Sequence, residues 1–183
     1  MSQQALLVMD VQRMIVDRYP DPDYLPRLRK AIETARTNGV RVIYVTVGFR
    51  PGAPEISPRN KLFGRLAGVT LPAAAAQANE IHPDVAPEPG DILVTKRRVS
   101  AFAGSDLDMV LRANDIDHLV LTGIATSGVV LSTLRQAADL DFTLTVLSDG
   151  CLDNDPEVQR VLTEKVFPMQ ADVTTVADWV DAH

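Results

Sequence analysis

Three predicted strands of this chain end in residues that could perform chemistry. The apolar run ALLVM ends at Asp10, the run DILVT ends at Lys96, and the run LVL is followed by a glycine-containing turn at 123–128. Because parallel strands place their carboxyl ends at one edge of a sheet, the three ends are expected to meet there. Burial raises the pKa of an aspartate and a nearby ammonium lowers it, so such a pair can hold a proton for transfer. Charged residues also end strands for purely structural reasons, and spacing alone leaves both interpretations open.

The segment 119–140 predicts a buried strand, a tight turn and a helix that opens at that turn. Either Thr126 or Ser127 is expected to act as its N-cap. Unpaired backbone N–H groups and the positive end of the helix dipole would then lie at the sheet edge, where open α/β sheets bind ligands. The apolar positions at helical spacing are Val129, Val130, Thr133, Leu134, Ala137 and Ala138.

The remaining pattern alternates strands with helices, which predicts an α/β fold with a six-stranded parallel sheet and right-handed crossovers. Residues 48–90 contain most of the prolines and no strong periodicity, and are expected to form a long loop of functional or interfacial importance. The predicted strands are 5–9, 40–47, 91–95, 119–121, 143–147 and 171–175, and the predicted helices lie at 25–35, 106–114, after the turn at 123–128, and at 156–167.

Composition restricts the function classes. A chain of 183 residues favours one domain, here 1–183, and a formal net charge of −6 disfavours a nucleic-acid-binding surface. No apolar run approaches the roughly 20 residues that span a bilayer, and no signal peptide is evident, so we expect a cytoplasmic protein without a membrane partner. One cysteine, Cys151, excludes an intramolecular disulfide, and three widely separated histidines predict neither a metal site nor a cofactor requirement.

Four segments carry a resemblance to a known family. They are MDVQ at 9–12, TKRRVSAF at 95–102, TGIATSGVVLSTLRQAADLDF at 122–142 and DPEVQRVLTEKVFPMQADVTT at 155–175. Together they resemble the isochorismatase-like hydrolases, also called the cysteine hydrolase superfamily. The resemblance implies a three-layer α/β/α Rossmann-like fold.

The resemblance also implies an active site made of an aspartate, a lysine and usually a cysteine at the ends of the first, third and fourth strands. It assigns the first two to Asp10 and Lys96. It further implies a non-proline cis peptide in the turn, expected at Ile124–Ala125, a strained feature of the kind that clusters at active sites.

One position departs from the family pattern. The turn of the amidase members has the form G-x-x-T-x-x-C-V, which places Val129 where the nucleophilic cysteine should be. Removal of a nucleophile lowers the rate on the order of 10⁶-fold in enzymes that depend on it. Cys151, expected beyond the following strand, is more typical of a buried apolar residue than of a nucleophile, and Ser127 or Thr126 would need a base aimed at it.

A site without cysteine can still catalyse. The resemblance offers an example, because the isochorismatase branch of the family also lacks the cysteine. That branch cleaves a vinyl ether, a reaction that needs a general acid and water. This chain has Ala125 and Thr126 where that branch has a Tyr-Ala pair, so isochorismate itself is not supported as the substrate.

Other residues could line the site. Gln12 could orient substrate or water, or cap the following helical turn, and Arg97 with Arg98 could bind an anionic substrate, contact another subunit or remain solvated. Asp149 and Asp153 are better explained by turn chemistry. The pocket candidates are Phe49, Arg50 and Phe102, the last also typical of a core residue, and the substrate-binding or oxyanion candidates are Gln12, Ile124, Ala125, Thr126, Ser127, Gly128 and Val129.

The leading hypothesis is a hydrolase of a small-molecule substrate that uses Asp10 and Lys96 without a covalent cysteine, on a vinyl ether or a C–N bond. The alternatives are a non-catalytic small-molecule-binding member of the family and an amidase that uses a non-standard nucleophile such as Cys151. The resemblance and the long 48–90 region also suggest a homo-oligomer, a dimer or higher, whose partner subunit helps to close the pocket.

Overall fold

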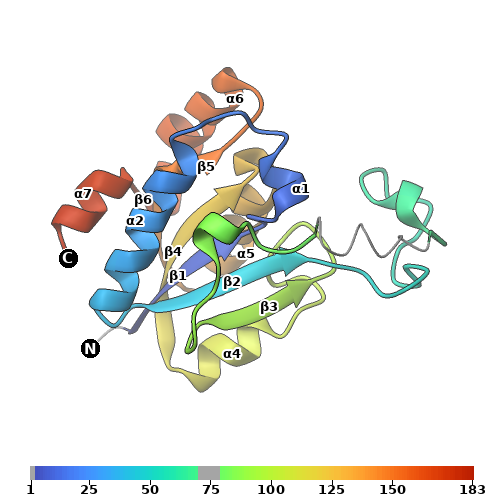
Figure 1. Ribbon diagram of the computed structural model, residues 1–183, viewed down its shortest axis with the longest axis horizontal. Helices are drawn as coiled ribbons and strands as arrows, with labels where there is room; N and C mark the ends of the chain where they lie inside the picture. Colours follow the sequence, from blue (N-terminus) through green and yellow to red (C-terminus); the bar gives the residue numbers. More distant parts are fainter. Residues whose placement is uncertain (1–2, 70–78) are drawn as a thin grey trace.

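The computed structural model describes residues 3–69 and 79–183, and a six-stranded parallel sheet lies at its centre (Figure 1). The strand order is β3-β2-β1-β4-β5-β6, and every pairing between neighbours is parallel. The sequence prediction of an α/β fold with a six-stranded parallel sheet is therefore confirmed. The strands are β1 (Gln3–Met9), β2 (Arg41–Val47), β3 (Ile92–Lys96), β4 (Ile116–Ile124), β5 (Thr143–Leu152) and β6 (Asp172–Thr174).

Helices cover both faces of the sheet (Figure 1). Helices α2 and α7 pack on one face and α4 and α5 on the other. The α-helices are α1 (Arg13–Val16), α2 (Tyr24–Thr37), α4 (Leu107–Ala113), α5 (Leu131–Asp139), α6 (Pro156–Val161) and α7 (Val176–Asp181). Shorter helical turns are η1 (Gly64–Leu66), η2 (Pro83–Val85), η3 (Thr126–Val130), η4 (Leu162–Val166) and η5 (Phe167–Met169).

Strand β1 belongs to both hydrophobic cores. Leu6 and Val8 pack with Leu28 of α2, whereas Leu7 packs in the other core with Leu134 of α5. Alternate side chains of a strand point to opposite faces, so a central strand covered on both sides needs a continuous apolar run. Each fully buried leucine of this kind contributes about 1.5–3 kcal/mol to the free energy of folding. Burial on both faces therefore holds β1 in place and with it Asp10, which follows the strand.

Strand β5 is longer than the sequence predicts. The predicted strand ends at Leu147, because the following Ser-Asp-Gly is typical of a turn. In the structure these residues form an irregularity in the strand, and pairing with β4 resumes between Gly123 and Cys151. The expectation that Cys151 lies beyond the strand is therefore wrong, since it lies within β5.

The helix after β4 begins differently from the prediction. Ala125 occupies the N-cap position, and the first turn, η3, is a π-helical turn rather than α-helix. Neither Thr126 nor Ser127 is the cap, because the Thr126 hydroxyl donates a hydrogen bond to Gln159 Oε1 at 2.6 Å instead. By contrast, Asp155 caps α6 by accepting hydrogen bonds from the first helical N–H groups, as the sequence predicts.

The long loop leaves the sheet after β2. Its described part up to residue 69 extends away from the layers of the fold (Figure 1). Residues 70–78 of the predicted loop at 48–90 lie outside the described residues, and residues 79–90, which include η2, lead to β3. Among the residues that the structure describes, no helix has the length and apolar character needed to cross a membrane.

Candidate active site

Asp10 and Lys96 form an ion pair at the carboxyl edge of the sheet. Asp10 follows β1 and Lys96 ends β3, so the lysine side chain reaches past the end of β2, which lies between them. Lys96 Nζ lies 2.9 Å from Asp10 Oδ2, and both side chains are buried. Asp10 has a φ of 56°, in the left-handed region that aspartate tolerates better than most residues. From β1 the chain continues to β2 and β3 on one side of the sheet and then crosses to β4 on the other side of β1. Open α/β sheets bind ligands at the strand ends where the order reverses in this way.

The electrostatic environment makes Asp10 suitable for proton transfer. Burial raises the pKa of Asp10 from 3.8 to about 6, although the charge of Lys96 and hydrogen bonds from Lys96 and the Val47 backbone act in the opposite direction. Its Oδ1 atom is buried and has no hydrogen-bond partner among the residues that the structure describes. Lys96 also donates a hydrogen bond to the backbone oxygen of Arg98 at 2.9 Å. Because a buried unsatisfied acceptor is costly, Oδ1 is a position that can accept a hydrogen bond from a ligand or can carry a proton.

The end of β4 approaches the pair closely because of one glycine. Gly123 has a φ of 142°, and a Cβ atom there would lie 2.3 Å from the Met9 backbone oxygen. Only glycine fits this contact. The peptide bond between Ile124 and Ala125 is cis, which confirms the prediction for that position. Val129, four residues further along η3, is buried in the core next to the site.

Several N–H groups of the turn already have partners within the protein. Ser127 N–H donates to Asp153 Oδ2 at 2.7 Å, and the N–H groups of Gly128 and Val130 donate to the Ala125 oxygen at 3.0 and 3.3 Å. Of the candidate donors of this turn, the N–H groups of Ser127 and Gly128 are therefore already used within the protein. The sequence predicts Asp153 only as a turn residue, and its bond to the turn depends on a contact across 26 residues that no local pattern signals.

Gln12 holds the loops around the site rather than facing an open cavity. Its side chain is buried, and its amide accepts from Val47 N–H at 2.9 Å and donates to the Val47 oxygen at 3.1 Å. The same amide nitrogen donates to the backbone oxygen of Asn79 at 2.8 Å. It makes no side-chain cap to α1, so the capping hypothesis is wrong. Gln12 therefore holds Val47, where the long loop begins, and Asn79, where its later part is described again, next to each other and close to Asp10.

The three pocket candidates lie in two different places. Phe49 packs edge-on against Phe63 of the loop, with ring centroids 5.3 Å apart, and Arg50 follows it at the surface. Phe102 is buried in the core and lies 6.1 Å from Phe142 between ring centroids. The structure thus brings Phe49 and Arg50 together but places Phe102 in the core.

A cavity of about 500 Å³ lies between the loop after β2 and the loop after β3. We call it the arginine pocket, and it is lined by Arg50, Glu55, Arg97, Arg98 and Gly104. Glu55 Oε1 accepts from the backbone N–H of Arg50 at 3.1 Å and lies 3.5 Å from Arg97 Nε. The sequence indicates the arginines but not Glu55, because a single carboxylate in an aperiodic loop gives no signal of its tertiary partners.

Cys151 lacks the features of a reactive thiol. Its side chain is 1% exposed, and burial raises the pKa of the thiol to about 12. Its Sγ atom lies 3.8 Å from the Leu121 backbone oxygen within the sheet. Because the thiolate is the nucleophilic form, this environment opposes attack on a substrate.

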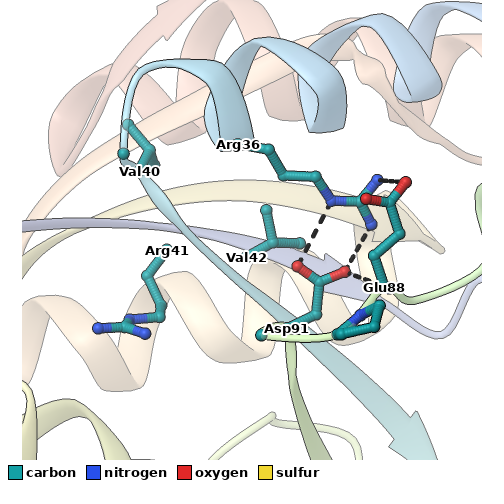
Figure 2. A pocket seen from close by; sticks show the side chains of 9 residues that line it. Arg36, Val40, Arg41, Val42, Glu88 and Asp91 are labelled. Carbon is teal, nitrogen blue, oxygen red and sulfur yellow. Dashed lines mark hydrogen bonds and ion pairs between the residues drawn. The ribbon is translucent and has the colours of Figure 1, made fainter.

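A second cavity, of about 380 Å³, lies at the opposite, amino end of the strands (Figure 2). Arg36 of α2 dominates it and donates to Asp91 from two nitrogens, Nε at 3.4 Å and Nη2 at 2.5 Å. Arg36 also pairs with Glu88 at 2.8 Å. These contacts tie the end of α2 to the segment before β3, which is a structural role.

Within residues 3–69 and 79–183, no group of three or more histidine, cysteine, aspartate or glutamate side chains is arranged to hold a metal ion.

Comparison with known proteins identifies the family. Residues 4–178 match the model of the isochorismatase domain, so the chain belongs to the isochorismatase family of hydrolases, within the cysteine hydrolase superfamily. It is 30% identical over 177 residues to the uncharacterized isochorismatase family protein YwoC of Bacillus subtilis, covering 97% of this chain and 92% of YwoC. It is 36% identical over 180 residues to the ureidoacrylate amidohydrolase RutB of Stutzerimonas stutzeri, covering 85% of this chain and 72% of RutB.

Solved structures agree with this assignment. An isochorismatase family protein from Burkholderia thailandensis superposes with a TM-score of 0.87 at 28% identity, covering 98% of this chain and 95% of that chain. The N-carbamoylsarcosine amidase of Thermoplasma acidophilum superposes with a TM-score of 0.75 at 30% identity, covering 95% and 96% of the two chains. The α/β fold with its parallel sheet is the fold of this family.

Proposed function

We propose that this protein hydrolyses a small metabolite by acid–base chemistry of Asp10 and Lys96, without a covalent cysteine intermediate. The observation that supports this most strongly is the buried Asp10–Lys96 pair, in which one carboxylate oxygen lacks a partner within the described part of the chain. A pKa of about 6 lets Asp10 exchange protons near neutral pH.

The proposal excludes a covalent intermediate because the described residues of the site include no activated nucleophile. The resemblance assigns the cysteine position to Val129, and the chain has a single cysteine, Cys151, whose buried thiol has a pKa raised to about 12. Water is therefore the proposed nucleophile.

A C–N bond is the proposed target. The names of two relatives state a ureido or carbamoyl substrate, namely ureidoacrylate for RutB and N-carbamoylsarcosine for the Thermoplasma amidase. In the proposed step the Asp10 carboxylate takes a proton from water, and the hydroxide oxygen bonds to the carbonyl carbon. Lys96 stabilises the negative charge that develops on the carbonyl oxygen. Asp10 then returns the proton to the leaving nitrogen as the C–N bond breaks.

Vinyl ether hydrolysis remains the second chemical route for the same pair. There the protonated Asp10 would donate its proton to the enol carbon, and water would add to the resulting oxocarbenium centre and lose a proton to the Asp10 carboxylate. The hemiketal would then break its C–O bond, releasing the alcohol and leaving a carbonyl group. The two routes differ in the form of Asp10 that they need. Activity on a C–N substrate should rise as the pH rises through about 6, whereas activity on a vinyl ether should fall over the same range.

The test is a hydrolysis screen of the purified protein against ureido acids, N-carbamoyl amino acids, nicotinamide and isochorismate, with Asp10→Asn and Val129→Cys in parallel. Turnover by the wild type that is lost in Asp10→Asn would support the proposal. Val129→Cys is a near-isosteric change at a buried position, so it should fold normally.

A non-catalytic binding protein is the alternative function, favoured by the assignment of Val129 to the cysteine position. It would replace our proposal if the wild type hydrolysed nothing in the screen and amide hydrolysis appeared only in Val129→Cys.

The proposal includes a homo-oligomer, because the loop after β2 exposes Leu62 and Val69 away from the core. Light scattering coupled to size-exclusion chromatography measures its order, and a strictly monomeric protein would contradict this part.

A further inference from the structure

We propose that the arginine pocket binds the carboxylate of the substrate, so that the protein acts on short carboxylic acids whose hydrolysable group reaches Asp10 and Lys96. This inference rests on the proposed function, because it names the substrate class of the same site.

The charge balance of the arginine pocket favours an anionic ligand. Three arginines face one glutamate, which leaves a formal excess of three minus one, or two, positive charges. The protein as a whole has a formal net charge of −6, so this excess is a local feature of the fold. Positively lined clefts attract and retain anions.

The cavity at the amino end of the strands provides an internal comparison. There Arg36 pairs with two carboxylates, Asp91 and Glu88, and the cluster needs no further anion. Arg41 also lines this cavity, so two arginines match two carboxylates there. In the arginine pocket three arginines face one carboxylate, an excess that a cluster built only to tie two loops together does not need.

The two inner arginines are held in place before any ligand binds. Arg97 donates to the Gly48 oxygen and lies 3.5 Å from Glu55 Oε1, while Arg98 donates to the backbone oxygens of Glu55 at 2.5 Å and Arg97 at 2.7 Å. A guanidinium has five N–H donors, so these bonds use only part of the capacity of each side chain. Fixed guanidinium groups are well suited to paired hydrogen bonds with a carboxylate.

Gly104 contributes to this fixed geometry. A Cβ atom at Gly104 would lie 2.8 Å from Arg97 Cβ, and the residue has a φ of 73°. The glycine therefore lets the loop after β3 pack directly on the Arg97 side chain.

Arg50 is placed to close over a bound anion. Its side chain is 64% exposed, and its ion pair with Glu55 spans 3.5 Å. A carboxylate in the arginine pocket would offer this guanidinium a second partner at the outer rim.

The arginine pocket neighbours the Asp10–Lys96 pair through the segment that follows β3. Arg97 and Arg98 follow Lys96 in the chain, and Lys96 Nζ donates to the Arg98 backbone oxygen at 2.9 Å. The N–H of Gly48 donates to the Lys96 oxygen at 3.2 Å, which fixes the opposite wall of the pocket to the same strand end. In this proposal a short acid held by the arginines extends from them towards the Lys96 ammonium.

The first experiment compares 3-ureidopropionate with 3-ureidopropionamide, in which a neutral amide replaces the carboxylate. Chromatographic detection of β-alanine or β-alaninamide reports cleavage of the ureido group in each compound. The wild type should have a kcat/KM at least tenfold higher for the acid. Arg97→Gln should raise KM for the acid by about 10- to 100-fold, the size expected for one charge-assisted contact, and should leave kinetics with the amide within about twofold.

Arg41→Gln is the matched control, since it removes the same charge from an exposed position in the cavity at the amino end of the strands. Its kinetics should equal those of the wild type with both compounds. An equal loss for acid and amide in Arg97→Gln would indicate a structural role and overturn the inference, as would equal kcat/KM values for the two compounds in the wild type.

A binding measurement separates this inference from the proposed function. Levulinate is a short keto acid without a hydrolysable bond, and 2-pentanone is a neutral ketone of the same chain length. Ligand-observed NMR should detect levulinate but not 2-pentanone on the wild type, and Arg97→Gln should abolish the levulinate signal. This result without any turnover would overturn the proposed hydrolase and keep the carboxylate site, whereas turnover without selective levulinate binding would overturn the carboxylate site alone.

Discussion

The two ends of the sheet each hold a buried carboxylate paired with a cation, yet only one pair is suited to chemistry. The Asp10 side chain is 9% exposed and the Asp91 side chain 7%, so burial does not distinguish them. Both oxygens of Asp91 accept hydrogen bonds, from Arg36 and from the Glu88 N–H, whereas Asp10 Oδ1 has no partner among the described residues. Unmet hydrogen-bonding capacity, rather than burial or pairing, therefore distinguishes Asp10 from Asp91.

The type of cation explains this difference. The planar guanidinium of Arg36 reaches both oxygens of Asp91, whereas the ammonium of Lys96 is a compact charge that contacts one oxygen of Asp10. The lysine therefore pairs with the acid but leaves one oxygen available for a proton or a substrate.

The largest expected effect comes from exchanging each acid for its amide. Asp10→Asn should lower kcat by about 10³-fold, because it removes the group that transfers the proton. Asp91→Asn should leave kcat within about twofold but lower the free energy of unfolding by about 2 kcal/mol, through weakened bonds to Arg36. Steady-state kinetics and urea unfolding measure the two effects. Comparable losses of kcat in both variants would remove the functional distinction between the two ends.

Two glycines, one at each end of the sheet, allow the two ends to be compared through the backbone as well. Gly123→Ala should lower the free energy of unfolding by about 3 kcal/mol and impair catalysis, because the new Cβ would meet the Met9 oxygen at 2.3 Å. Gly39, at the amino end, also has a positive φ, but no atom of the described residues lies within 4 Å of the position that a Cβ would take there. Gly39→Ala should therefore cost only about 1 kcal/mol. Urea denaturation tests both, and equal losses would show that the Met9 contact is not critical.

Removal of the lysine charge should shift the titration of Asp10. Lys96 lowers the pKa of Asp10 through its charge and hydrogen bond, so Lys96→Met should raise that pKa above about 6, by about 1–3 pH units. The pH dependence of residual kcat/KM reports this shift, with circular dichroism as the control for folding. A midpoint that stays near pH 6 would mean that Lys96 does not tune Asp10.

The smallest effect on activity is expected at the cysteine. Cys151→Ala removes a buried thiol and should lower stability by about 1 kcal/mol while kcat changes less than about twofold. A loss of activity on the scale of Asp10→Asn would instead identify Cys151 as the nucleophile.

Much of the fold and the proximity of Asp10 and Lys96 could be predicted from local patterns in the sequence, whereas the proposed catalytic role of the pair comes from the family resemblance. Apolar runs and helical spacing give the alternation of strands and helices, and parallel topology then brings Asp10 and Lys96 to one edge. The prediction that Gly123 opens the turn is wrong, because Gly123 lies within β4, where it pairs with Met9 and Cys151, and no local pattern signals these contacts.

The rest of the site depends on contacts between distant loops. Glu55, Asn79 and Asp153 carry no periodic signal, and their partners lie in other elements. The extension of β5 through Cys151 was missed because turn-forming residues are accommodated inside a strand by tertiary pairing. The sequence predicts that the Thr126 hydroxyl can cap the helix, but this hydroxyl donates a hydrogen bond to the side-chain oxygen of Gln159, which lies in α6.

The pH dependence of kcat/KM for the wild type on a ureido acid tests the central claim most directly, because it reports the ionisation of the free enzyme. If Asp10 is the general base, kcat/KM should rise about tenfold per pH unit below about pH 6 and level off above it. A profile without an inflection near pH 6 that rises towards alkaline pH, as expected for a buried thiol, would contradict the account.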